Sequence, residues 1–73
     1  MKIYYKDNSG EYHEASEIVL LLDDKDDISP FKKFFQKTSA VLDEKWDSFG
    51  HEHFKDSEYF MGGADVLISR NRE

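Results

Sequence analysis

The stretch SPFKKFFQKTSAVLDEKWDSFG, residues 29–50, decides the expected fold because its chemistry marks both ends of one helix. Ser29 is a residue type that caps helix N-termini, and Pro30 suits the first helical position, where its missing N–H is not needed. Gly50 follows the last periodic residue, as glycine commonly does at a helix C-terminus. The stretch therefore predicts a single helix that begins at Ser29 and ends just before Gly50.

Apolar residues recur along this helix at spacings of three and four, which places them in one stripe. The stripe consists of Phe31, Phe34, Phe35, Thr38, Val41, Leu42, Trp46 and Phe49. Large aromatic side chains bury the most area, so we expect Trp46 and Phe49 to be the main anchors. The stripe should pack against a sheet.

Two β-hairpins are expected, one on each side of the helix. Residues 2–6, KIYYK, favour a strand, and the turn-forming residues 7–10 separate them from EYHEA, which resumes the alternation. After the helix, EYFM and ADVLISR flank Gly62 and Gly63, a pair suited to a two-residue hairpin turn. Residues 50–57 are expected to form a loop.

Residues 16–22 are ambiguous from sequence alone. Ile18 and Val19 favour a strand, whereas Ser16 before Glu17 and three leucines would also start a short helix. We favour a continued, bulged strand. The expected order is then β-β-α-β-β, an α+β fold in which a small antiparallel sheet packs on one central amphipathic helix. Residues 1–73 have room for a single domain.

The composition indicates the cellular compartment and the class of partner to expect. The chain has no cysteine, so disulfides and thiolate metal sites are excluded, and its N-terminus does not read as a signal peptide. Its longest apolar run is too short to cross a bilayer, and we expect a cytoplasmic protein. The net charge of -6 argues against direct binding to nucleic acid and favours a basic partner.

Charge is distributed unevenly along the chain. Residues 1–28 carry a formal charge of -5, residues 29–42 carry +3, and residues 43–60 carry -4. The basic part comes from Lys32, Lys33 and Lys37 in the first half of the helix, where the helix dipole disfavours cations. The three lysines fall outside the apolar stripe, so the neighbouring phenylalanines are expected in the core. Whether the lysines have a function stays open.

The run DDKDD, residues 23–27, is the most acidic stretch. An EF-hand loop beginning at Asp24 would need glycine at its sixth position and glutamate at its twelfth, but Ser29 and Phe35 stand there. The calcium motif therefore fails. Two interpretations remain, a solvated loop near the positive end of the helix dipole or a contact surface for a basic partner.

The pair His51 and His53 resembles closely spaced zinc ligands, with Asp47 or Asp56 as a third candidate. Two imidazoles do not make a zinc site, and the remaining histidine, His13, comes from the opposite end of the chain. We expect surface loop histidines, with no metal and no cofactor. The chain also lacks nucleophile and phosphate-loop motifs, so we expect no enzymatic activity.

The function predicted from these patterns is binding and blocking of a basic partner, such as a nucleic-acid-binding protein or a nuclease. The expected contact residues are Asp23, Asp24, Asp26, Asp27, Asp43, Glu44 and Asp47. In size and charge the chain resembles small acidic phage-encoded inhibitors, among them DNA mimics and anti-CRISPR proteins, and bacterial immunity proteins. The alternative is a small self-associating accessory protein that acts as a homodimer. Its interface would then contain Tyr4, Tyr5, Tyr12, Tyr59 and Phe60.

Overall fold

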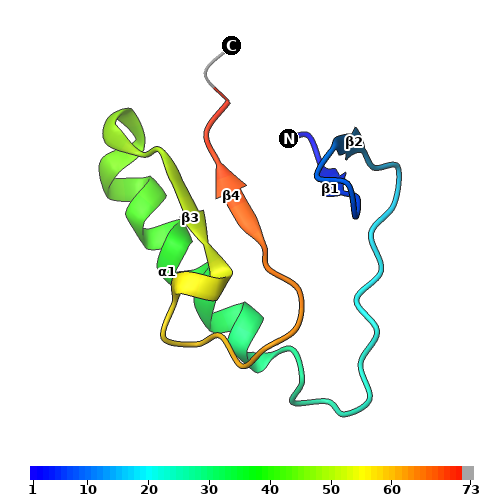
Figure 1. The fold of residues 1–73 in the computed structure, drawn as a ribbon. Coiled ribbons are helices and arrows are strands. Elements are labelled where there is room, and N and C mark those ends of the chain that lie inside the picture. Colours follow the sequence, from blue (N-terminus) through cyan, green and yellow to red (C-terminus); the bar gives the residue numbers. More distant parts are fainter. Residues whose placement is uncertain (72–73) are drawn as a thin grey trace.

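A computed structural model describes residues 1–71 as two β-hairpins with one helix between them in sequence (Figure 1). The strands are β1 (Tyr4–Lys6), β2 (Tyr12–Glu14), β3 (His51–His53) and β4 (Leu67–Ser69). The helix α1 (Ser29–Lys45) precedes two short 3-10 turns, η1 (Trp46–Ser48) and η2 (Phe54–Asp56). The mixed α+β class and the order β-β-α-β-β are as expected. The expected single sheet is not formed, because β1–β2 and β3–β4 are two separate antiparallel pairs.

The first hairpin follows the sequence pattern closely. Tyr4 pairs with Glu14, and Lys6 pairs with Tyr12. The turn between the strands is held by the Asp7 carboxylate, which accepts hydrogen bonds from the N–H groups of Ser9 and Glu11. Gly10 completes the turn at a φ of 91°, a conformation that side-chain-bearing residues rarely adopt. Local turn chemistry therefore determines this element.

Residues 16–22 form neither a strand nor a helix, so the predicted bulged strand is wrong. The segment runs as an extended trace from β2 toward α1 (Figure 1). A strand needs a neighbour for its backbone N–H and C=O groups, and none of the described residues 1–71 forms one beside this segment. A β-favouring composition is therefore insufficient by itself to make this segment a strand.

The helix begins at Ser29, but the serine hydroxyl does not cap it. Ile28 occupies the N-cap position in a helical conformation, and no side chain caps this end. The chain is already turning before the helix, because the N–H of Asp27 donates to Asp24 O and that of Ser29 to Asp26 O. The expected cap at Ser29 is wrong for this reason.

The second hairpin is present, but the prediction that EYFM forms its first strand is wrong. Its first strand, β3, lies within the expected loop of residues 50–57, whereas EYFM is not a strand. His51 pairs with Ser69, and His53 pairs with Leu67. The long connection contains Gly62 and Gly63 at φ values of 99° and 87°, so both adopt the expected positive φ without forming a two-residue turn. Phe60 instead packs edge-on against Phe54, at 5.2 Å between ring centroids.

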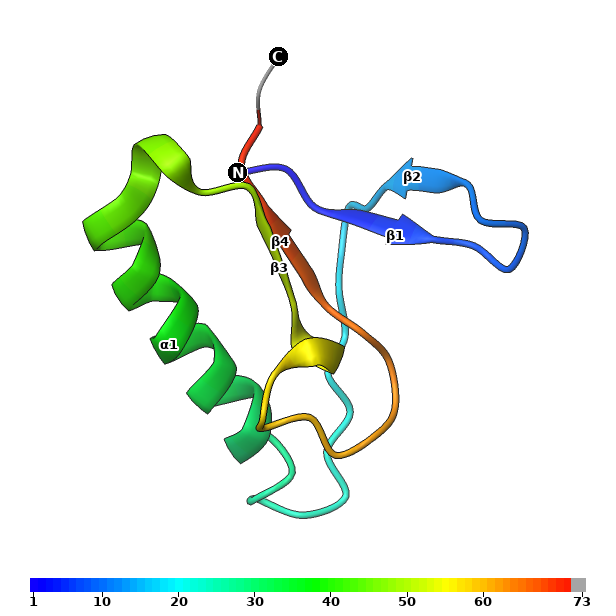
Figure 2. The ribbon, with the colours of Figure 1, turned by 60° about the vertical axis from the view of Figure 1, so that its left-hand side comes forward.

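The core lies between α1 and the residues around the second hairpin. Its buried apolar side chains among residues 1–71 are Phe34, Phe49 and Phe54, joined by Thr38. The rings of Phe34 and Phe54 lie 5.2 Å apart and connect the helix to η2. Figure 2 shows α1 alongside β3 and β4, with the β1–β2 hairpin to one side.

Only part of the expected apolar stripe is buried. Phe49 is an anchor as expected, but Trp46 is 50% exposed and Phe35 is 46% exposed, so Trp46 is not an anchor. The α-helix ends at Lys45, and the change to a 3-10 turn rotates Trp46 off the stripe. Helical periodicity does not carry through such a change.

Candidate functional site

We call Asp23, Asp24, Asp26 and Asp27 the N-terminal acidic run; all four residues are exposed. The Asp27 carboxylate accepts hydrogen bonds from the N–H groups of Asp23 and Asp24, at 2.9 and 3.0 Å. Asp24 Oδ1 accepts another from the N–H of Asp26, at 2.8 Å. Two carboxylates therefore hold the loop in shape, while the side chains of Asp23 and Asp26 make no hydrogen bond to any residue among 1–71.

These bonds predict unequal effects of alanine substitution. Asp27→Ala removes two acceptor contacts just before α1 and should lower the free energy of unfolding by about 1 kcal/mol. Asp26→Ala is the matched control, since it removes the same charge but no side-chain hydrogen bond, and should stay within about 0.5 kcal/mol of wild type. Urea unfolding followed by circular dichroism measures both. Equal midpoints for the two variants would contradict the structural role of Asp27.

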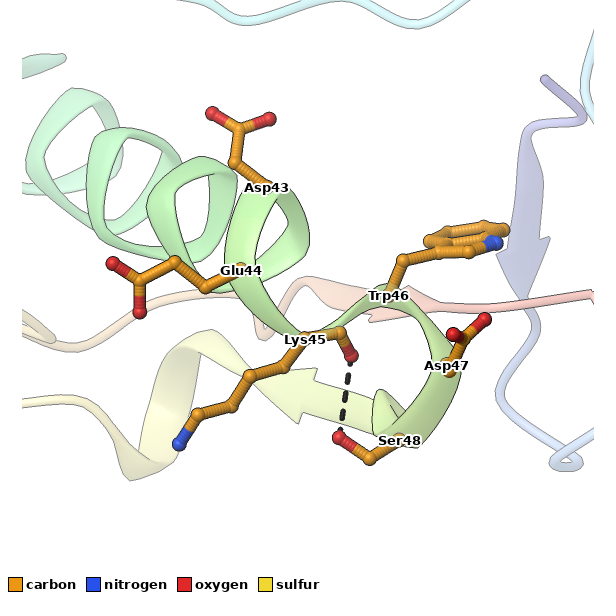
Figure 3. A pocket seen from close by; sticks show the side chains of 6 residues that line it. All are labelled: Asp43, Glu44, Lys45, Trp46, Asp47 and Ser48. Atoms are coloured by element: carbon orange, nitrogen blue, oxygen red, sulfur yellow. Dashed lines mark hydrogen bonds between the residues drawn. The ribbon is translucent and has the colours of Figure 1, made fainter.

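We call Asp43, Glu44 and Asp47 the C-terminal acidic cluster; these residues lie at the end of α1 and in η1. With Lys45, Trp46 and Ser48 they line a shallow hollow of about 470 Å³. The carboxylates of Asp43 and Glu44 point outward in different directions, while Trp46 extends over the other side of the turn (Figure 3). No pair of carboxylates converges here as an acid/base pair would require.

Trp46 is half exposed beside this cluster, and Arg70 holds it in place. The Arg70 guanidinium lies 4.7 Å from the centroid of the indole ring. Its Nη1 also donates to the backbone oxygens of Trp46 and Asp47, at 2.9 and 3.1 Å. A cation at carbonyls near a helix end is favourable, so Arg70 fixes the geometry of the C-terminal acidic cluster.

The structure does not bring the two acidic groups together. They lie at opposite ends of α1, which spans about 25 Å for its 17 residues. Within residues 1–71, ion pairs form only between His13 and Asp7 and between His53 and Asp65. None of the seven predicted contact residues therefore has a cationic partner among the described residues.

The helix lysines lie between the two acidic groups and are exposed. Lys32, Lys33 and Lys37 all face solvent, as the helical phase predicts. The Lys37 ammonium lies 6.0 Å from the centroid of the Tyr59 ring, at the outer limit of a cation–π contact. The lysines do not neutralise either acidic group.

The histidines lie on strands rather than in loops. His51 and His53 project from β3 with their rings 5.3 Å apart, and His53 Nδ1 lies 2.6 Å from Asp65 Oδ2. This partner is neither Asp47 nor Asp56, the candidates considered from sequence. Burial raises the pKa of Asp65, but hydrogen bonds from the Lys55 N–H and His53 outweigh that effect and lower it overall.

His13 is brought to the first hairpin turn, where its Nε2 lies 2.7 Å from Asp7 Oδ2. Ligand atoms of Asp7, Glu11 and His13 lie within 4.8 Å of one another, the single grouping of this kind among residues 1–71. Asp7 already accepts bonds from the Ser9 hydroxyl and two N–H groups, so the cluster has a structural role in the turn.

The pKa of the Asp7 carboxyl group tests this structural role. The hydrogen bond from the Ser9 hydroxyl, followed by those from His13 and the Glu11 N–H, holds its pKa well below the ordinary value of 3.8. Because the folded-state pKa is depressed, the stabilisation is fully present above the unfolded value and is lost as pH falls below it. Amide chemical shifts of Ser9 and Glu11 should show a midpoint well below 3.8, and Ser9→Ala should raise that midpoint. A wild-type midpoint at or above 3.8 would contradict the assignment.

Comparison with protein-family models, curated proteins and solved structures found no match. The function therefore has to be argued from the surface itself. Within residues 1–71, no helix combines the length and apolar character needed to cross a membrane.

Sequence reasoning missed three residues that shape these surfaces. Arg70 ties the end of β4 to the C-terminal acidic cluster, and Asp65 ties the long connection to β3. Trp46 was expected in the core but is part of the surface. Its place at the end of the periodic pattern, next to Asp47, was the available signal, since helices often tighten into a 3-10 turn there.

Proposed function

We propose that this chain is a non-enzymatic protein that binds a basic partner protein and blocks its nucleic-acid-binding face. The contact residues are those of the N-terminal acidic run and the C-terminal acidic cluster. The observation that carries this proposal is that all seven side chains are exposed and none forms an ion pair within residues 1–71. With a net charge of -6, these carboxylates present a field that attracts a cationic surface.

The two acidic groups suit a partner that contacts both ends of α1. A continuous helix about 25 Å long separates them, so the charges do not need to be ordered on binding. The hydrogen-bonded loop of the N-terminal acidic run has the same advantage. Carboxylates in this arrangement would occupy positions where phosphates bind, which gives inhibition by occupancy in the manner of a DNA mimic.

Trp46 adds an aromatic contact to the C-terminal acidic cluster. It is half exposed, and tryptophan is among the residues most often found at the energetic centre of protein interfaces. A partner arginine next to Asp43 and Asp47 could pair with a carboxylate and contact the indole. This combination fits a basic protein better than it fits a small-molecule substrate.

The proposal also includes the class of the partner protein and the cellular location of the complex. A nucleic-acid-binding protein or nuclease in the cytoplasm is the expected partner, and direct binding to nucleic acid, a membrane or a cofactor is not part of the function. The proposed role is that of a phage-type inhibitor, such as an anti-CRISPR protein, or of an immunity protein.

Affinity capture with the wild type and with a charge-neutralised variant tests the proposal. The tagged protein is incubated with nuclease-treated cell extract, so that nucleic acid cannot bridge two proteins. We expect a basic protein that is retained by the wild type and lost when the seven contact residues are changed to asparagine or glutamine. Retention of the same protein by both forms, or of acidic proteins only, would contradict the proposal.

Self-association is the second candidate function, and a specific observation favours it. Tyr4, Tyr5 and Tyr12 on the first hairpin are all more than half exposed. Exposed aromatics on a two-stranded hairpin are suited to an interface, because such a hairpin is marginally stable alone.

A further inference from the structure

Residues 18–22, which we call the apolar segment, are the most unusual surface of the molecule. They read Ile-Val-Leu-Leu-Leu, and every one of them is exposed. Val19 is 72% exposed and Leu21 is 87% exposed. Single exposed hydrophobic residues are ordinary, but a run of five is expected only where another surface covers it.

The backbone of this segment is unpaired as well as apolar. Among residues 1–71, no hydrogen bond involves residues 16–22. The segment runs extended between the first hairpin and α1 (Figure 1). An extended, β-favouring backbone with free N–H and C=O groups is a template for strand addition.

An apolar hollow lies directly against the segment. It has a volume of about 400 Å³, and residues of the segment form part of its wall. The rest of its apolar lining comes from Ile28, Pro30, Phe31, Phe54 and Met61, and Asp27 and Gly62 also line it. A protein that covers the segment would therefore also close this hollow.

The accessible surface of the chain is larger than that of a compact monomer of the same mass. It measures 6456 Å², whereas a folded monomer of 8.6 kDa is expected to expose about 4,700 Å². The excess is about 1,800 Å² per chain, and half of it, about 900 Å², already exceeds the ~800 Å² that each partner buries in a standard interface. The core is also small, with three buried apolar side chains among residues 1–71, and domains with so small a core often gain stability by oligomerisation.

We propose that two copies of this chain pair through the apolar segment, as antiparallel strands related by a two-fold axis at Leu20. Ile18 of one copy then faces Leu22 of the other, and Leu20 faces its own counterpart. This arrangement satisfies the free backbone groups, covers the exposed side chains and completes the strand that the sequence favours. This pairing is independent of the proposed binding to a basic partner, and it places the self-association interface on the apolar segment rather than on the tyrosines of the first hairpin.

The charges that flank the segment give this dimer a distinctive response to salt. In the two-fold pairing, Glu17 of one copy lies opposite Asp23 of the other at each end. Like charges in that position oppose pairing, and salt screens them. Raising NaCl from 50 to 500 mM should therefore tighten the dimer by about three- to ten-fold. Binding to a basic partner responds in the opposite direction, so failure of one proposal is distinguishable from failure of the other.

Sedimentation equilibrium of the full chain tests the pairing. We expect the wild type to be dimeric at micromolar to high micromolar concentrations and Leu20→Asp to be monomeric, with a dimer dissociation constant at least 100-fold higher. Ser39→Asp is the charge control, because it adds the same charge at an exposed residue of α1 outside the apolar segment and should remain dimeric. A wild type that stays monomeric, or a Leu20→Asp variant that dimerises as the wild type does, would overturn the proposal.

A cysteine variant keeps the test decisive if Leu20→Asp fails to fold. The chain contains no cysteine, so Leu20→Cys introduces a single thiol at the two-fold axis. Facing Cβ atoms in antiparallel strands are close enough for a disulfide after small adjustments. Mild oxidation with diamide should crosslink Leu20→Cys rapidly and Ser39→Cys, at an exposed residue of α1, at least ten-fold more slowly. Equal crosslinking of both variants, or none at residue 20, would overturn the two-fold pairing.

Discussion

Replacing Phe34 with alanine should lower the free energy of unfolding by about 3–5 kcal/mol. Phe34 is only 2% exposed, and its ring packs 5.2 Å from that of Phe54. The substitution would leave a cavity where α1 meets η2, and so small a core has few side chains that can close it. Since domains of this size are stable by roughly 4–11 kcal/mol, the variant should be largely unfolded near physiological temperature.

Phe35 provides the matched control, because it is the same residue type at the next position of the same helix. It is 46% exposed, so Phe35→Ala should cost about 1 kcal/mol. Trp46→Ala should also cost less than about 2 kcal/mol, although the sequence pattern predicts an anchor there. Thermal and urea unfolding by circular dichroism measure all three. Equal losses for Phe34→Ala and Phe35→Ala would contradict the assigned core.

Neutralising both acidic groups should slow association with the captured basic partner by about 10- to 100-fold at low salt. The variant carries asparagine in place of each aspartate and glutamine in place of Glu44. Asparagine retains a side-chain oxygen, so the loop bonds made by Asp24 and Asp27 can persist and the fold should be intact. The effect should fall mainly on the association rate, because long-range attraction acts before contact.

Separate variants show whether both ends of α1 contribute. Neutralising either group alone should slow association by about 3- to 10-fold, and 300 mM salt should reduce all of these differences. Glu11→Gln, Glu14→Gln, Glu52→Gln and Asp56→Asn together match the charge change of the N-terminal acidic run at other exposed positions. Stopped-flow kinetics at low and high salt supply the rates. If this control slows association as much as the acidic-run variant does, net charge rather than the proposed surface is responsible.

The acidic groups illustrate how far sequence reasoning reaches toward a site. Their residue types and exposure followed from charge patterning, because carboxylates without partners stay in water. Their separation by the length of α1 followed only from the helix bounds. The hydrogen bonds that shape the loop around Asp24 and Asp27 depend on backbone conformation, which composition does not reveal.

The elements with local signals could be predicted from the amino-acid sequence. The turn at Asp7 and Gly10 and the body of α1 are stabilised by contacts between residues near one another in the chain, so short-range patterns identify them. The strand β4 was also anticipated within ADVLISR.

Tertiary structure alone decided which segments gained neighbours. His51–His53 became a strand because Leu67–Ser69 lies beside it. The β-favouring residues 18–22 did not, since no strand within the described part of the chain, residues 1–71, pairs with them. Burial was decided in the same way, with Phe54 enclosed by Phe34 and Phe60 and Trp46 left at the surface. Strand pairing and burial depend on contacts distant in sequence, and their free energy is gained only when the partner segment is in place.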